Sequence, residues 1–378
     1  MSSTVNKLAN AVYQQLPSLS GEKVSEMDPV PWTDPAVEPE VPDEAEKVQE
    51  LMEVIRRIQE KNFGMHRHAF RGTHVKTQAV VKGSLTVNED LPPHLAQGLF
   101  RKPGVYPVAA RYSNEPSFLQ DDRTPGPRGM GLKVFGVEGK HLDPSGDRTR
   151  TQDFTFNNAP MLELTDLPTT LEIFTLRERH FDDPSGLNKE LWWRKDHAIQ
   201  VAPQELPNVH PVSFTMYSQS AFRYGDYVCK YALFPSTELQ QSLNSLKITK
   251  DSSPSEISCW MQAYFREHSA EYDFKVQLLR EPDRQSVEDT SKPWTETAFP
   301  YETVGKVVFP AGQDAFDAAR RVFWEDRMKL NVWYGLEEHR PLGSVNRLRK
   351  ELYKMSQGYR AEVNATPILE VSDVNEIP

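Results

Sequence analysis

The hydrophobic positions of the chain follow a helical period over residues 43–62. Apolar side chains recur there three or four positions apart, acidic residues lead the stretch, and Gly64 follows it. This spacing places the apolar side chains on one face of an amphipathic helix, and the flanking residues are typical of helix ends. The sequence therefore predicts a helix over residues 43–62. Its apolar face is formed by Val48, Leu51, Ile55 and Ile58.

After residue 74 the pattern changes to short runs rich in valine, phenylalanine and tyrosine, separated by glycine, proline and aspartate. Many short runs at turn-punctuated intervals predict the strands of an antiparallel sheet or barrel. The expected strand regions are residues 77–87, 105–113, 129–137, 151–158, 212–235, 272–281 and 302–310.

Further helical patterns stand between and after these runs. They cover residues 169–181, 188–200 and 252–268, the last with Ser252 or Ser253 near its N-cap. Residues 312–360 also read as helical apart from a Pro-Leu-Gly break. We therefore expect an α+β fold, with an antiparallel β-barrel core and surrounding helices.

The N-terminal part is different in composition. Residues 17–44 are rich in proline, glutamate and aspartate, which disfavours regular structure. We expect an N-terminal arm or linker over residues 1–42 and one domain over residues 43–378. The arm is equally consistent with an extended linker and with a segment that wraps a partner subunit.

Composition narrows the functional classes. The 378 residues carry a formal charge of −10, which argues against binding nucleic acid or an anionic membrane. Two cysteines are too few for a disulfide framework or a cysteine-rich zinc site. We see neither an apolar secretory signal nor a run of 18 apolar residues, so a cytoplasmic protein without a transmembrane segment is expected.

Three local motifs carry little chemistry. His66 and His68 share a strand face, but no carboxylate or cysteine stands at convincing ligand spacing. The glycine-rich residues 125–131 lack the Lys-Ser/Thr of a phosphate-binding loop. No G-x-S-x-G motif of a hydrolase is present.

Five motifs gain meaning from their order along the chain. They are Arg71-x-x-His74, Arg111-Tyr112-Ser113, PRGMGLKVFG at 127–136, DFTFNNAP at 153–160, and YGLEEHRPLG at 334–343. This series resembles the catalase superfamily of haem proteins, which show Arg-x-x-His, Arg-Phe-Ser, Asp-Pro-Arg-Gly-Phe-Ala-Val-Lys-Phe and Asn-Asn-Thr-Pro at matching places. Catalases then have a tyrosine seven residues before a basic residue that Leu-Gly follows.

The resemblance implies a catalase-like domain that binds ferric haem b and acts on a peroxide. It also implies a homo-oligomer, a dimer or tetramer, in which the N-terminal arm takes part. Carried over to this chain, it implies these roles: His74 as the distal histidine, Asn158 as the distal asparagine, Ser113 behind His74, Arg71 and Arg111 on the haem propionates, and Tyr334 as the iron ligand on a C-terminal helix.

These residue types suit peroxide chemistry. A tyrosinate is a hard anionic donor for ferric iron. A neutral imidazole can take a proton from one peroxide oxygen and return it to the other. An asparagine amide hydrogen-bonds the peroxide without competing for protons, and arginines match propionates in charge and geometry.

Two departures from the catalase pattern concern the expected iron ligand. Catalases have an arginine four residues before the ligand tyrosine, where this chain has Leu330. The basic residue before Leu-Gly is replaced by Pro341, with Arg340 one place earlier as the remaining candidate for a third propionate contact.

Two further departures concern the distal pocket. True catalases usually have valine at the position of Thr73. The catalase-related allene oxide synthases have threonine there, as this chain does. Leu162 and Glu163 occupy the place of a Phe-Phe pair. The chain is also expected to lack the C-terminal helical domain of larger catalases.

Thr73 and the altered pocket favour an organic, fatty-acid-like hydroperoxide, or hydrogen peroxide used peroxidatively. The resemblance places the chain nearer to the small catalase-like and allene oxide synthase-type branch than to true catalases. A true hydrogen peroxide catalase, a non-enzymatic haem binder and a scaffold that has lost haem remain alternatives.

Overall fold

The computed structural model describes residues 22–143 and 146–378. Within these ranges, nine antiparallel strands form one sheet in the order β5-β4-β3-β2-β1-β9-β8-β7-β6. A further pairing of β5 with β7 closes eight of the strands into a barrel, and β6 extends β7 as a hairpin. The strands are β1 (Thr77–Val87), β2 (Gly104–Asn114), β3 (Arg128–Phe135), β4 (Thr151–Asn157), β5 (Met216–Tyr217), β6 (Phe222–Tyr224), β7 (Tyr227–Pro235), β8 (Ala270–Leu278) and β9 (Glu302–Phe309).

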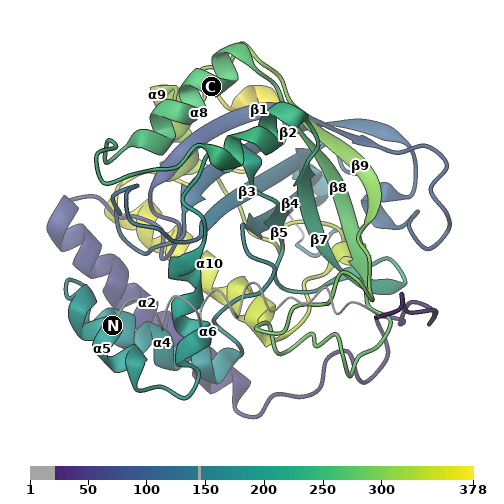
Figure 1. Cartoon of the computed structure of the whole chain (residues 1–378), viewed down its shortest axis with the longest axis horizontal. Coiled ribbons are helices and arrows are strands. Elements are labelled where there is room, and N and C mark those ends of the chain that lie inside the picture. The colour runs from purple at the N-terminus through teal and green to yellow at the C-terminus, as the bar shows by residue number, and fades with distance from the viewer. Residues whose placement is uncertain (1–21, 144–145) are drawn as a thin grey trace.

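The α+β barrel expected from the sequence is therefore confirmed, and every expected strand region contains a strand. Helices α2, α4, α5 and α6 gather on one side of the barrel, and α10 runs between them and the strands (Figure 1). The helices are α2 (Glu44–His66), α3 (Gly146–Thr149), α4 (Leu167–Arg179), α5 (Pro184–Trp192), α6 (His197–Val201), α7 (Glu238–Ser242), α8 (Glu256–Glu267), α9 (Ala318–Val322) and α10 (Ser344–Val363).

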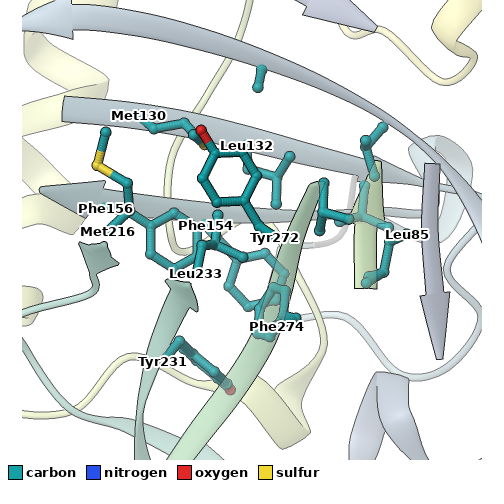
Figure 2. Packing of buried hydrophobic residues seen from close by; sticks show 14 of the residues in the cluster. Leu85, Met130, Leu132, Phe154, Phe156, Met216, Tyr231, Leu233, Tyr272 and Phe274 are labelled. Atoms are coloured by element: carbon teal, nitrogen blue, oxygen red, sulfur yellow. The ribbon is translucent and has the colours of Figure 1, made fainter. Parts of the chain in front are cut away.

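The barrel interior is filled by large apolar side chains from alternate strand positions (Figure 2). Phe154 stands at its centre, with ring centroids 5.1 Å from Tyr231 and 5.3 Å from Phe274 in edge-to-face contact. Such contacts add to the free energy gained from burying the rings. Because this core fills the barrel, a ligand site has to lie on its outer surface.

The helix expected over residues 312–360 is interrupted more widely than the sequence suggested. Residues 328–343 are not α-helical. The barrel takes up their backbone groups instead: Asn331 N–H donates to Asp153 Oδ2 (2.9 Å), and Asp153 N–H donates to Tyr334 O (2.9 Å). These tertiary hydrogen bonds replace helical ones, so the prediction that Tyr334 stands on a helix is wrong.

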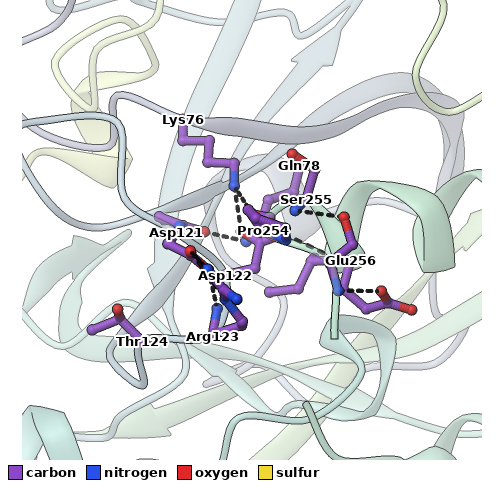
Figure 3. A network of polar contacts seen from close by, with 12 residues as sticks. Lys76, Gln78, Asp121, Asp122, Arg123, Thr124, Pro254, Ser255 and Glu256 are labelled. Carbon is purple, nitrogen blue, oxygen red and sulfur yellow. Dashed lines mark hydrogen bonds and ion pairs between the residues drawn. The ribbon is translucent and has the colours of Figure 1, made fainter. Parts of the chain in front are cut away.

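The start of α8 shows another tertiary substitution. Ser255 occupies the N-cap position but makes no side-chain capping bond, so the expected cap by Ser252 or Ser253 is not found. The carboxylate of Asp122 approaches from a distant loop and accepts from Ile257 N–H (3.0 Å). Asp122 also receives a hydrogen bond from Lys76 Nζ (2.7 Å), which links α8 to the segment before β1 (Figure 3).

The described part of the N-terminal segment lies against its own chain. Val30 N–H donates to Leu279 O (2.8 Å), and the ring of Trp32 lies 4.3 Å from the Arg223 guanidinium. Residues 1–21 of the expected arm are outside the described residues. The part that the N-terminal arm plays in a dimer or tetramer stays a prediction.

His339 inside the barrel predicts acid sensitivity. Its Nε2 accepts from Leu99 N–H (2.8 Å), so the neutral ring carries its proton on Nδ1, which lies 2.8 Å from the Tyr231 hydroxyl. Burial lowers the pKa of His339 to about 3. Between that value and about 6.5 the unfolded chain binds the extra proton. The free energy of unfolding should therefore fall as pH drops through this window, by up to about 5 kcal/mol from this group.

Thermal unfolding at pH 7 and pH 4 measures this effect. The His339→Phe variant should be less stable at pH 7 but lose less stability on acidification than the wild type. His66→Gln, at an exposed position, serves as the control. An unchanged pH dependence in His339→Phe would contradict the assignment.

Candidate active site

Two rows of residues cross the outer face of the barrel from β2 to β4. Ser113, Gly129 and Asn157 are paired neighbours in one row. Arg111, Gly131 and Thr155 are paired neighbours in the next. A glycine stands at the centre of each row, so no side chain projects from the middle of this wall. All of these residues except Gly129 line one cavity.

His74 lies over the first row. A Cβ atom on Gly129 would come within 2.4 Å of the His74 imidazole, so the ring uses the space that glycine leaves free. His74 has a left-handed backbone (φ 54°) held by its N–H bond to Glu115 O (2.7 Å). The ring Nδ1 lies 3.1 Å from Ser113 Oγ. The structure thus brings together His74, Ser113 and Thr73, as expected from the sequence.

Burial lowers the pKa of His74 to about 4. The charge of Glu115 acts against this shift, while those of Arg111, Arg349 and Arg71 reinforce it. His74 is therefore a neutral imidazole at pH 7, which is the form that can accept a proton.

The asparagine pair is arranged differently from the expectation. Asn157, on the same face of β4 as Thr155, lines the cavity. Its Oδ1 accepts from Asn158 N–H (2.8 Å), so its amide N–H groups can face a ligand. The Asn158 Oδ1 accepts from Arg128 N–H (2.8 Å). Because side chains alternate along a strand, the first asparagine rather than Asn158 is beside His74.

Helix α10 forms the wall of the cavity that faces the barrel. Arg349, Tyr353 and Arg360 all project from it into the lining. The space between these walls that no atom occupies is about 970 Å³, and part of it is open to solvent. The apolar lining includes Ile55, Met130, Phe156, Trp324, Leu330 and Leu352.

Three buried guanidiniums meet in this cavity. Arg71 donates to Trp324 O (2.5 Å) and Glu325 O (3.0 Å), and Arg360 donates to the same Glu325 carbonyl. Arg111 donates to Thr77 Oγ1 (2.8 Å) and His74 O (2.7 Å). In the described part of the chain these three guanidiniums donate to neutral oxygens rather than to carboxylates, and Arg360 Nε is buried without a hydrogen-bond partner.

Burial is the main cause that lowers the pKa of each of these three arginines. The neighbouring guanidiniums add to this shift for Arg111 and Arg360, and the carboxylate of Glu325 acts against it for all three. Three cations held together away from water repel one another. The site is therefore built to receive negative charge. Arg71 and Arg111 were expected here from the sequence; Arg360 was not.

Tyr334 and Arg340 lie elsewhere. Both line a separate hollow on the other side of α10, together with Trp333 and Lys350. Burial raises the pKa of Tyr334, although the ammonium of Lys329 lies 4.0 Å from its ring. The structure does not bring Tyr334 or Arg340 to His74, because residues 328–343 are bound to β4 rather than wound into a helix.

Tyr353 is a second phenol, and it lines the cavity that Tyr334 does not reach. Its sequence neighbourhood carries a signal: Arg349 stands four residues before Tyr353, and Arg360 stands seven residues after it. The motifs that resemble those of catalases have an arginine and a basic residue at these spacings from a tyrosine. The Leu342-Gly343 pair, which pointed to Tyr334, immediately precedes α10.

Three other sequence features fall outside the cavity. Leu162 packs in a separate apolar cluster with α2 and α4, and Glu163 pairs with Arg177 (3.0 Å). Neither residue lines the cavity described here. His68 pairs with Asp326 (2.9 Å).

Among the residues that the structure describes, no helix combines the length and apolar character needed to cross a membrane.

Comparison with known proteins places the fold. No protein-family model matches the chain, and no curated protein sequence matches it significantly. Solved structures do match it. A fungal catalase has a TM-score of 0.61 at 16% sequence identity, and the match covers 83% of this chain and 65% of the fungal chain. Catalase A from Saccharomyces cerevisiae gives 0.60 at 16%, covering 83% and 67%. A bacterial catalase gives 0.53 at 15%, covering 99% and 73%.

The chain therefore has a catalase-like fold. It spans just under two thirds of the length of the fungal catalase. At these identities the likeness extends to the fold alone, so chemistry has to be argued from the cavity.

Proposed function

We propose that this protein binds ferric haem b in the cavity between α10 and the barrel and uses it to cleave a peroxide. The observation that carries the proposal is the cluster of Arg71, Arg111 and Arg360 in the cavity lining. In the described part of the chain these guanidiniums form no hydrogen bond to a carboxylate. Two haem propionates would supply such carboxylates. The apolar lining suits the faces of an aromatic macrocycle, and the glycines at the centre of the wall leave room for the His74 ring and for Leu330.

Tyr353 is the residue that would coordinate the haem iron through its phenolic oxygen. It projects from α10, the wall opposite the one that carries His74 and Asn157. Arg349, one helical turn earlier on the same face, would stabilise negative charge on the phenolic oxygen. Arg349 is itself oriented by Asn346 Oδ1 (2.9 Å) and Ser220 Oγ (3.0 Å). When bound, haem supplies the redox chemistry that breaks an O–O bond.

The chain's own residues would handle the proton. With hydrogen on Nδ1 donated to Ser113 Oγ, His74 Nε2 keeps a free lone pair. Nε2 would take the proton from the inner peroxide oxygen and return it to the outer one. The amide of Asn157 would hold the peroxide by a hydrogen bond.

The proposed substrate is an organic hydroperoxide, or hydrogen peroxide used peroxidatively. Thr73 supports this choice, because it places a hydroxyl-bearing side chain next to His74 in the cavity lining. That hydroxyl can hydrogen-bond the bound peroxide and change which reaction follows.

The test begins with the absorbance spectrum of purified protein reconstituted with haem, where a Soret band at about 400 nm is expected. Oxygen release from hydrogen peroxide and loss of the conjugated-diene absorbance of a lipid hydroperoxide are then compared. Diene loss with little oxygen release supports the organic substrate. Rapid oxygen release without diene loss would make the protein a true catalase, and no Soret band would refute haem binding.

A further inference from the structure

A buried ionic network adjoins the segment that holds His74. Arg177 of α4 donates to Glu115 Oε1 (3.1 Å) through one nitrogen and to Glu163 Oε1 (3.0 Å) through another. The Glu115 and Glu163 side chains are only 15% and 5% exposed. Two carboxylates thus share one guanidinium, which leaves one formal negative charge in a region that water barely reaches.

Glu115 connects this network to the active site in two ways. Its backbone carbonyl accepts from His74 N–H (2.7 Å), which helps to hold the left-handed backbone of His74. Its carboxylate is the charge that acts most strongly on the His74 imidazole. Because Arg177 fixes that carboxylate from α4, the position of α4 is coupled to the distal side of the cavity.

The charges that surround His74 explain why such a network matters. Arg71 from its own loop, Arg111 from β2 and Arg349 from α10 all disfavour a proton on the imidazole. Glu115 opposes them, and its charge acts on the ring more strongly than that of any one of the three arginines. A base that must accept a proton next to several guanidiniums needs a nearby negative charge.

We propose that Glu115, held by Arg177, is a positioning residue that keeps His74 basic enough to deprotonate the bound peroxide. Glu163 shares the guanidinium and so preserves the net negative charge of the network. The inference rests on the proposed haem function, because it assigns a base strength to that same site.

Cyanide binding to the haem-loaded protein tests the inference without turnover. Hydrogen cyanide has to lose its proton when cyanide binds ferric iron, so its association rate reports on the distal base. Glu115→Gln keeps the size and the backbone carbonyl but removes the charge. We expect association at pH 7 to slow by up to about tenfold, because a weaker base accepts the proton of hydrogen cyanide more slowly. The acid limb of the rate profile should move to lower pH. A variant whose site is only structurally disturbed would instead lose cyanide binding at a higher pH than the wild type does.

Two further variants separate charge from folding. Glu163→Gln should shift the profile in the same direction but less, because its carboxylate lies beyond Arg177. Glu178→Gln, on the same helix but paired with Lys61 (2.7 Å), should leave the rate within about twofold. A Glu115→Gln rate and profile equal to those of the wild type would overturn the proposal.

Failure of the haem proposal gives a different result. The wild type would then show no Soret band, and the His74 titration would be followed in haem-free protein by NMR of labelled histidine, assigned with His74→Gln. A His74 pKa unchanged by Glu115→Gln would overturn the role of Glu115. A lowered pKa would support it even without haem.

Discussion

Replacing Tyr353 with phenylalanine should weaken haem binding more than about a hundredfold, because changes to outer-shell groups at metal sites already cost ten- to hundredfold. The substitution removes the oxygen that would coordinate iron but keeps the ring that packs in the cavity wall. Haem would then be held by the arginine cluster and apolar contacts alone. Haem titration followed at the Soret band, and haem retained after gel filtration, measure the loss.

Tyr334→Phe is the matched control for that experiment. Tyr334 lies in the hollow on the other side of α10 and should have no effect on haem affinity. The pair of variants decides between the two phenols. Loss of haem in Tyr334→Phe with normal binding in Tyr353→Phe would restore the assignment suggested by the sequence motif and refute the structural one.

Replacing His74 with glutamine should leave haem binding intact and reduce peroxide turnover by about a hundredfold to ten-thousandfold, the usual contribution of a positioned base. Glutamine roughly fills the space above Gly129 but cannot take up the proton at neutral pH. Steady-state rates with a lipid hydroperoxide and with hydrogen peroxide, normalised to haem content, measure the effect.

The same variant distinguishes an enzyme from a haem carrier. In a carrier, His74→Gln would change neither haem content nor any peroxide-dependent rate. Asn157→Ala provides an independent check from β4, since its amide lines the same cavity as His74. Asn158→Ala is its control and should affect stability rather than turnover, because Asn158 binds the backbone of Arg128.

Local patterns were sufficient for much of the fold. The alternation and turn residues around β1 placed it at Thr77–Val87, and the helical period of Val48 to Ile58 located α2. The pattern failed over residues 328–343, whose sequence suits a helix. There the carboxylate and backbone of Asp153 on β4 bind the segment in a non-helical form, an interaction that no local pattern records.

The sequence by itself predicted the barrel and the main helices, because these depend on hydrophobic period. The resemblance of its motifs to those of catalases predicted the grouping of Arg71, His74, Arg111 and Ser113. Tertiary structure decided between neighbours that look alike in the sequence. Strand alternation and the pairing of Gly129 with Asn157 brought the first asparagine, and not the second, to the cavity. The packing of α10 against α2, α4 and residues 323–327 turned Tyr353 and Arg360 toward the cavity, while Tyr334 stayed outside it, because a helix face is chosen by what it packs against.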